Sequence, residues 1–188
     1  MDNGLSRNGI GRRYFLRLCG VAATGCLLPA SALALASRVQ APEKAISLLN
    51  IHTGERLDRV FYAGGAYVSD AMSAIDRLLR DHRTGEIKPI DYGLIDQLHA
   101  IAARLDPGAP FHVVSGYRSA RTNEMLRRQG HAAAKHSFHL SGRAVDVRLP
   151  GVARADLRRA ARSLRAGGVG DYPDPGFVHL DTGPVRAW

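Results

Sequence analysis

The stretch Ser137-Phe138-His139-Leu140-Ser141-Gly142-Arg143-Ala144-Val145-Asp146 places an imidazole, a flexible turn and a carboxylate within ten residues. Residues 144–149 alternate as a strand does, which puts Asp146 on the face opposite its two valine neighbours. Gly142 permits a tight turn that returns His139 over this carboxylate. A second strand is predicted at Phe177–Asp181, with His179 and Asp181 on one face. Two strands can therefore bring ligands to a shared cleft.

The ligand types in these two strands indicate a divided zinc site. Two imidazoles and one carboxylate, from His139, Asp146 and His179, would leave one coordination position of Zn2+ for water. That ligand count is typical of a catalytic rather than a structural zinc site. Cys19 and Cys26 both precede residue 37, so neither a disulfide nor a thiolate ligand is expected in the domain that follows.

The rest of the pattern mixes strands with helices and predicts one α+β domain over residues 45–188. Further strands are expected at 45–51, around 59–62 and at 111–114, the first two as a hairpin. Helices are expected from Ser69 onward, over 92–105 after an Asp91 cap, over 121–129 and over 156–164.

Residues 1–36 have the composition of an export signal, followed by a linker over 37–44. Arg12 and Arg13 before an aromatic residue and a leucine resemble the twin-arginine signal of proteins exported folded, which places the mature domain in the periplasm. The apolar run 18–28 is shorter than the roughly 20 residues of a spanning helix, so an uncleaved anchor is the second interpretation. Lipidation at Cys26 is disfavoured, because no large aliphatic residue stands just before it.

The positive net charge of the chain indicates which classes of partner it can bind. Without the four arginines and one aspartate of residues 1–36, the formal net charge of +9 becomes +6. In an exported protein without an aromatic-rich basic tract, this charge suits an anionic envelope polymer or a membrane surface better than nucleic acid. A solvated basic face that aids solubility explains most of the arginines equally well. We expect a monomer without an integral membrane span.

The motif Ser137-x-His139-x-x-Gly142-x-Ala144-x-Asp146, with a late His179, resembles the zinc peptidases related to D-Ala-D-Ala carboxypeptidases and the hedgehog domain. The segments 115–119 and 177–188 are similar to the murein endopeptidase K subgroup, over almost all of residues 46–188. The resemblance implies a small, mostly antiparallel sheet flanked by helices, with zinc on its open face. It also implies an endopeptidase that cuts peptidoglycan crosslinks between two meso-diaminopimelate residues during cell-wall growth or remodelling.

The resemblance implies roles for single residues as well. His139, Asp146 and His179 match the metal ligands, and Arg118 matches an arginine that faces the substrate or the developing oxyanion. The usual proton acceptor is absent, because relatives carry it where this chain has Gly176 or Phe177. The residues that remain open for this role are Asp181, Asp174, Asp171 and His136.

Asp181 is the first of these candidates, because a residue two positions after His179 on one strand faces the same side. Orienting His179 as a hydrogen-bond acceptor is an equally good role for Asp181. Two other functions stay open on the sequence. One is a D,D- or L,D-carboxypeptidase that trims stem peptides, and the other is a non-catalytic zinc-fold module that binds peptidoglycan.

Overall fold

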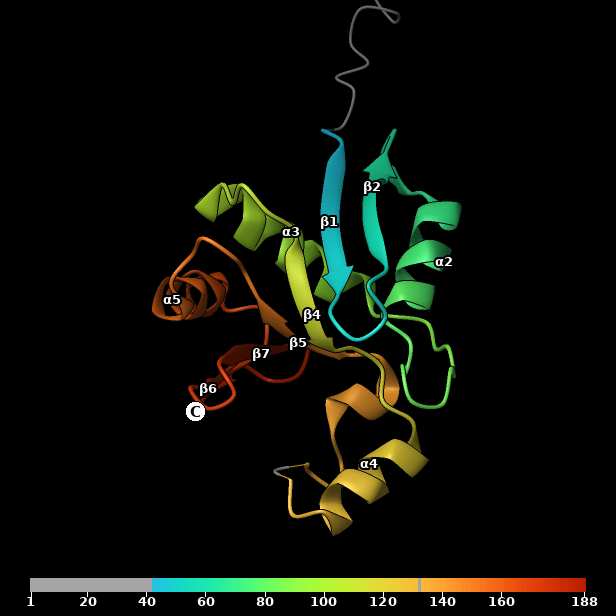
Figure 1. Cartoon of the computed structure of the whole chain (residues 1–188). Coiled ribbons are helices and arrows are strands. Elements are labelled where there is room, and N and C mark those ends of the chain that lie inside the picture. Colours follow the sequence, from blue (N-terminus) through green and yellow to red (C-terminus); the bar gives the residue numbers. More distant parts are fainter. Residues whose placement is uncertain (1–41, 132) are drawn as a thin grey trace, which may run out of the picture. The chain divides into compact units, whose positions relative to one another are not determined.

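A single eight-stranded sheet, in the order β3-β2-β1-β4-β5-β7-β6-β8, organises the domain (Figure 1). The computed structural model describes residues 42–131 and 133–188. The predictions made for residues 1–36, namely the twin-arginine signal, its cleavage and Cys26, lie outside the described residues. Among the residues that are described, no helix has the length and apolar character needed to cross a membrane.

The strands of the sheet are β1 Lys44–Asn50, β2 Arg56–Ala63, β3 Ala66–Tyr67, β4 Phe111–Ser115, β5 Ala144–Arg148, β6 Gly168–Tyr172, β7 Phe177–Asp181 and β8 Arg186–Ala187. The helices are α2 Ser69–Leu78, α3 Tyr92–Leu105, α4 Ala120–Arg128 and α5 Arg154–Leu164, with a short 3-10 helix η1 at Phe138–Ser141. Most neighbouring strands are antiparallel, and the β1–β4 and β6–β8 pairs are parallel. The predicted α+β class and mostly antiparallel sheet are confirmed.

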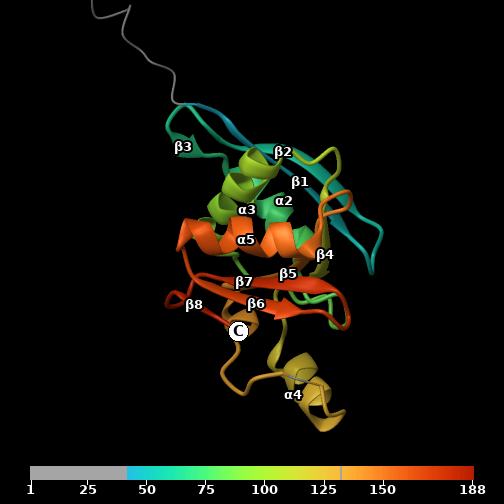
Figure 2. The same cartoon turned by 90° about the vertical axis from the view of Figure 1, so that its left-hand side faces the viewer.

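The hydrophobic core lies between the sheet and helices α2, α3 and α5, which are seen in Figures 1 and 2. Strand alternation fixes which side chains enter it. Val145 and Val147 of β5 and Val178 and Leu180 of β7 are fully buried in this core. Because successive strand residues point to opposite faces, Asp146 and the odd-numbered residues of β7 lie on the other face of the sheet.

Helix α3 shows how local sequence sets an element. Its N-cap Asp91 accepts a hydrogen bond from the backbone N–H of Gly93, and Leu94, Leu98 and Ile101 are fully buried along one side. The helix ends at Leu105, as predicted. Helix α4 projects below the sheet, beside the end that carries η1 (Figure 1).

Several elements differ from the sequence predictions. β1 ends at Asn50 instead of residue 51, because the Asn50 side chain accepts hydrogen bonds from the N–H groups of His52 and Thr53 and starts a turn. α5 begins at Arg154, two residues earlier than predicted. β6 was not predicted as a strand, and its residues Gly168–Tyr172 pair with β7 and β8.

Candidate metal centre

The register of β5 and β7 places two of the predicted ligands side by side. Asp146 lies directly opposite His179 in this antiparallel pair. Residues opposite each other share a face, so their side chains meet on the side of the sheet away from the core. The Asp146 Oδ1 atom is 2.8 Å from His179 Nδ1, and both residues are buried.

The third residue, His139, comes from η1. Ser137 caps this short helix by accepting a hydrogen bond from the His139 backbone N–H. Gly142 ends it with φ +69°, and a Cβ at this position would lie 2.4 Å from the carbonyl oxygen of Pro89. The turn that the sequence predicted at Gly142 therefore also allows a close backbone contact that only glycine fits. It brings His139 Nε2 to 3.3 Å from Asp146 Oδ1 and 3.2 Å from His179 Nδ1.

The triangle of these three atoms is close in size to the ligand triangle of a zinc ion, although its Asp146–His179 side is shorter. A tetrahedral zinc with bonds of about 2.0–2.2 Å separates its ligand atoms by about 3.3–3.5 Å, and the three observed separations are 2.8, 3.2 and 3.3 Å. The carbonyl oxygen of Gly116 accepts a 2.7 Å hydrogen bond from His139 Nδ1, which assigns the proton to that nitrogen. The lone pair of His139 Nε2 is thus directed to the centre of the triangle.

His179 is oriented in the same way by Asp181. The carboxylate Oδ2 atom lies 3.1 Å from His179 Nε2, so this nitrogen donates to Asp181 and Nδ1 is the nitrogen that faces Asp146. Asp181 is fully buried and also accepts hydrogen bonds from the backbone N–H groups of Gly168 and Gly183 and from the Arg186 guanidinium. Its carboxylate is therefore fully engaged behind His179.

The charges around the triangle shift two pKa values. Burial alone would lower the pKa of His179, but its hydrogen bonds to Asp146 and Asp181 dominate and raise the pKa to about 9. Without a metal, His179 therefore also carries a proton on Nδ1, and a metal ion would have to displace that proton to bind there. Burial alone would raise the pKa of Asp146, but His139 and His179 hold that pKa well below its usual value. The Asp146 carboxylate therefore remains ionised, as a metal ligand must be.

Strand β6 makes room for this arrangement through its glycines. Gly170 lies opposite His179, and a Cβ there would come within 2.7 Å of the Trp188 indole. A Cβ on Gly168 would lie 2.5 Å from Asp181 Oδ2. Because glycine has a low strand propensity, Gly168 and Gly170 conceal this strand in the sequence.

Arg118 lies beside the triangle, as the sequence analysis expected. Its Nη2 atom is 3.9 Å from Asp146 Oδ2, and its Nη1 atom donates to Asn123 Oδ1 at 3.2 Å. Burial lowers the pKa of Arg118, and the attraction of Asp146 partly offsets this effect. An arginine keeps its charge under any such shift, so a guanidinium lies next to the triangle.

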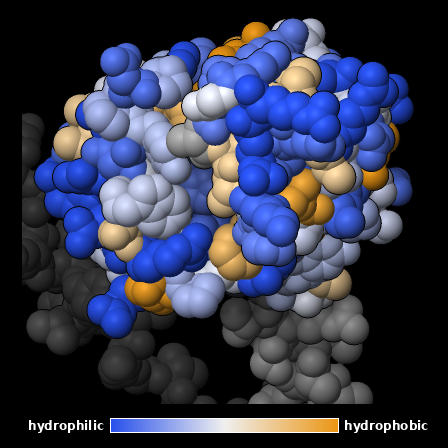
Figure 3. Space-filling model, turned by 90° about the horizontal axis from the view of Figure 1, so that it is seen from below, coloured by the Kyte–Doolittle hydropathy of each residue, from blue (hydrophilic) through white to orange (hydrophobic). Residues whose placement is uncertain are grey.

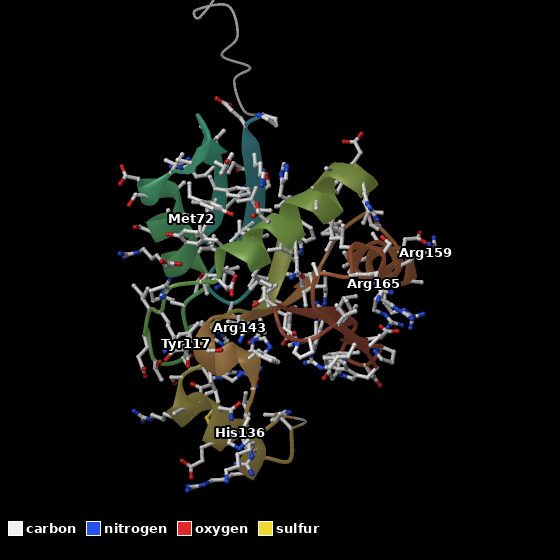
Figure 4. The ribbon with its side chains drawn as sticks, turned by 180° about the vertical axis from the view of Figure 1, so that it is seen from behind. Met72, Tyr117, His136, Arg143, Arg159 and Arg165 are labelled. Atoms are coloured by element: carbon white, nitrogen blue, oxygen red, sulfur yellow. The ribbon has the colours of Figure 1, made fainter. Side chains whose placement is uncertain are left out.

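The other candidate proton acceptors lie in different places. His136 follows α4 (Figure 4) and lines the same pocket as His139 and His179. Asp171 lies on the opposite face of β6 from Gly170, where the Arg154 and Arg158 guanidinium groups hold it. Asp174 lines a neighbouring pocket.

Two pockets meet at Arg118 and Tyr172. The first contains the histidines of the triangle and is walled by Phe138, Arg186 and Trp188. The second is largely apolar, and its lining includes Val114, Met125, Leu126, Pro175 and Phe177. Figure 3 shows that the surface seen from below, on the side of α4, is mainly hydrophilic. Tyr172 and Trp188 were not among the predicted site residues.

The buried His–Asp–His triangle on the open face of the α+β sheet, beside a pocket, could hold a metal ion, as the site of a metallopeptidase does. The family model described as peptidoglycan L,D-endopeptidase MepK, a group of M15 peptidases, matches residues 38–188. The chain therefore belongs to this family. M15 peptidases are in general zinc-dependent.

Individual relatives agree with the family match. Peptidoglycan L,D-endopeptidase MepK of Escherichia coli K12 is 42% identical over 177 residues, which cover 94% of this chain and 96% of that protein. The probable peptidoglycan L,D-endopeptidase MepK of Haemophilus influenzae is 40% identical over 178 residues, 94% of this chain and 95% of that protein. No solved structure matches the chain. The resemblance to the murein endopeptidase K subgroup is confirmed.

Proposed function

We propose that this protein is a zinc-dependent endopeptidase that hydrolyses peptide crosslinks in peptidoglycan. The observation that carries the proposal is the triangle of His139 Nε2, Asp146 Oδ1 and His179 Nδ1, three possible ligand atoms that converge beside a pocket. Family membership supports the reaction, because the relatives are named peptidoglycan L,D-endopeptidases. Their name also implies work outside the cytoplasm, and the twin-arginine leader is the export route that we propose.

The roles of the three ligands follow from their hydrogen bonds. His139 and His179 bind through the nitrogens that face Asp146, while Gly116 and Asp181 hold their second nitrogens. Zinc bound there would polarise the scissile carbonyl and make water a nucleophile near neutral pH. Of the two roles open to Asp181, the contacts favour orienting His179, because the carboxylate is buried and accepts from four other donors.

His136 is the proton acceptor that we propose. Among the four candidates it alone lines the pocket of the two ligand histidines. Asp171 is engaged by two arginines, and Asp181 lies behind His179. An imidazole that is exposed beside the ligand pocket can accept a proton from the attacking water and pass it on to solvent.

The two pockets favour an endopeptidase over a carboxypeptidase. A crosslink continues as peptide on both sides of the scissile bond, so its enzyme needs space on both sides of the reacting carbonyl. The pockets that meet at Arg118 and Tyr172 provide that space. A carboxypeptidase needs only a short pocket for the released residue.

The substrate's charge also fits the site. Crosslinks between two meso-diaminopimelate residues carry free carboxylates close to the scissile bond, and an L-centre acyl group joins a D-centre amine, as an L,D-endopeptidase requires. Arg118 is placed to bind such a carboxylate or the developing oxyanion. We propose this link as the substrate.

Purified protein loaded with zinc and incubated with intact sacculi tests the proposal, with released fragments identified by mass. Conversion of crosslinked dimers into monomers supports the endopeptidase, and shortened monomer stems would indicate a carboxypeptidase instead. Protein that leaves both unchanged would fit only a binding module. His139→Ala should lose zinc, and Tyr62→Phe, a change in β2 on a distant part of the sheet, should leave zinc retention and cleavage unchanged.

A further inference from the structure

Trp188 is fixed beside the metal ligands by the backbone of β6. Its N–H donates to the carbonyl oxygen of Val169 at 3.3 Å, and its own carbonyl accepts from Asp171 N–H at 2.9 Å. The preceding strand β8 pairs in parallel with β6. Although half of Trp188 is exposed, its backbone is therefore held as firmly as a strand residue.

The indole ring packs between groups of the site. Its centroid is 5.4 Å from that of the His179 ring, and the Arg186 guanidinium carbon lies 4.9 Å from the indole centroid. Gly170 leaves the space below it, as described above. Trp188 is half exposed and so is not a core residue, yet its neighbours on three sides hold the indole ring in one orientation facing a pocket.

The indole N–H sets the orientation of a neighbouring hydroxyl. Trp188 Nε1 lies 3.1 Å from Tyr172 Oη. Because an indole N–H can only donate, Tyr172 Oη is the acceptor in this bond and keeps its own proton for another partner. Among the described residues, the Tyr172 hydroxyl donates to no protein acceptor.

The free proton of Tyr172 faces the reacting space. Tyr172 lies opposite Phe177 in the β6–β7 pair, two residues from the position opposite His179, so its side chain shares the face of the metal ligands. It lines both pockets, as Arg118 does. A neutral donor and a guanidinium thus face the junction at which a peptide crossing the site would present its scissile carbonyl.

We propose that the Tyr172 hydroxyl, oriented by the indole N–H of Trp188, donates a hydrogen bond to the scissile carbonyl oxygen as that oxygen becomes negative. This proposal rests on the proposed function. When water oxygen adds to the carbonyl carbon, the water's proton passes to the His136 imidazole and the π electron pair moves to the carbonyl oxygen. The Tyr172 and Arg118 donors stabilise the resulting negative charge. Tyr172 is then a catalytic residue and Trp188 a positioning residue.

Steady-state kinetics on a purified crosslinked muropeptide dimer tests the proposal. Removing one oxyanion donor typically lowers kcat about 100-fold or more, so we expect Tyr172→Phe to do so with KM nearly unchanged. Trp188→Phe keeps a ring but loses the N–H, and we expect a fall in kcat of about 5- to 10-fold, as for one neutral hydrogen bond. Tyr62→Phe is the matched control, because this tyrosine of β2 loses the same hydroxyl outside both pockets.

A double-mutant cycle separates positioning from mere packing. If Trp188 acts through the Tyr172 hydroxyl, Trp188→Phe lowers kcat in the wild-type background and has no further effect in Tyr172→Phe. Equal losses in both backgrounds would mean that the indole acts independently, which would overturn its positioning role.

A binding measurement keeps this proposal distinct from the proposed function. Trp188 is the single tryptophan of the chain, so its fluorescence reports a phosphinate analogue of the crosslink, whose tetrahedral oxyanion imitates the reacting group. The Tyr172→Phe variant should bind this analogue about 100-fold more weakly, in parallel with its kcat loss. If the wild-type protein bound the analogue through Tyr172 but cleaved no crosslink, the proposed function would be wrong, while the role of Tyr172 in binding the oxyanion would stand. Wild-type cleavage with unchanged kcat and analogue affinity in Tyr172→Phe would refute the role of Tyr172.

Discussion

The substitution Asp181→Asn separates the two roles that a carboxylate next to the last ligand histidine can have. Asp181 Oδ2 accepts from His179 Nε2 and Arg186, and Oδ1 accepts from two backbone N–H groups and Arg186. An asparagine side chain has one acceptor oxygen and one donor amide. In either orientation its NH2 group faces at least one of these donors, and the negative charge is lost.

The expected cost follows from the burial of the carboxylate. Asp181 is fully buried, and hydrogen bonds to a charged group contribute about 1.5–3 kcal/mol each, so we expect the free energy of unfolding to fall by about 2–3 kcal/mol. Loss of an acceptor behind a ligand histidine typically weakens metal binding by about 10- to 100-fold. Without the Asp181 acceptor, the neutral imidazole of His179 could carry its proton on Nδ1, the nitrogen that would bind the metal ion.

Zinc affinity by competition with a chromophoric chelator, together with urea unfolding of the metal-free protein, measures both effects. Asp171→Asn is the matched control, because this carboxylate of β6 also accepts from two arginines but lies on the opposite face. It should leave zinc affinity unchanged. If Asp181→Asn bound zinc as tightly as wild type and yet lost more than about 1000-fold in kcat, Asp181 would be the proton acceptor and the reasoning here would be wrong.

Three further perturbations give separate tests. Gly170→Ala should displace the indole of Trp188, since its Cβ would come within 2.7 Å of that ring, and a shifted fluorescence spectrum with reduced cleavage should report this. Burial would raise the pKa of Asp81, but hydrogen bonds from Thr122 and Ser119 lower it to about 2, so stability due to this group is complete above about pH 4 and lost as the pH falls toward 2. Urea unfolding between pH 5 and 2 should therefore show a loss of about 2 kcal/mol that Asp81→Asn removes. Removing zinc with a chelator should lower the thermal midpoint, because a ligand at 1,000 times its Kd stabilises the folded state by about 4 kcal/mol.

The elements that could be predicted from the sequence are mostly those with caps, apolar faces and terminating residues within one short segment. Helix α3 has its cap, its apolar face and its terminating Pro107-Gly108 within one continuous segment, so its bounds follow from that segment alone. Strand β6 has no such local signal, because Gly168 and Gly170 disfavour a strand in isolation. Its conformation is explained by distant partners, namely β7 and the indole of Trp188.

The candidate site also contains some residues that local patterns predict and others that they do not. Asp146 and His179 could be placed on strand faces from alternation, and the register of β5 and β7 brings them together. The second partner of each histidine was harder to predict. Asp181 follows His179 by two residues and was considered, whereas the Gly116 carbonyl that fixes His139 comes from the end of β4 and no pattern around His139 indicates it. Hydrogen bonds between distant segments depend on the tertiary fold, which local patterns do not describe.

The absence of a carboxylate at residue 176 is explained by what the same strand does instead. Gly176 has φ +84° and forms the turn that starts β7, and its carbonyl accepts from Arg148, so a residue with a catalytic side chain there would need a strained backbone. In the proposed function another segment takes the proton, and His136 in the loop after α4 lines the pocket of His139 and His179. Asp181 is left free to fix the tautomer of His179, and Tyr172 with Trp188 can supply the donor. In the proposed site these roles belong to three different segments, so we expect His136→Ala to lower kcat without lowering zinc affinity.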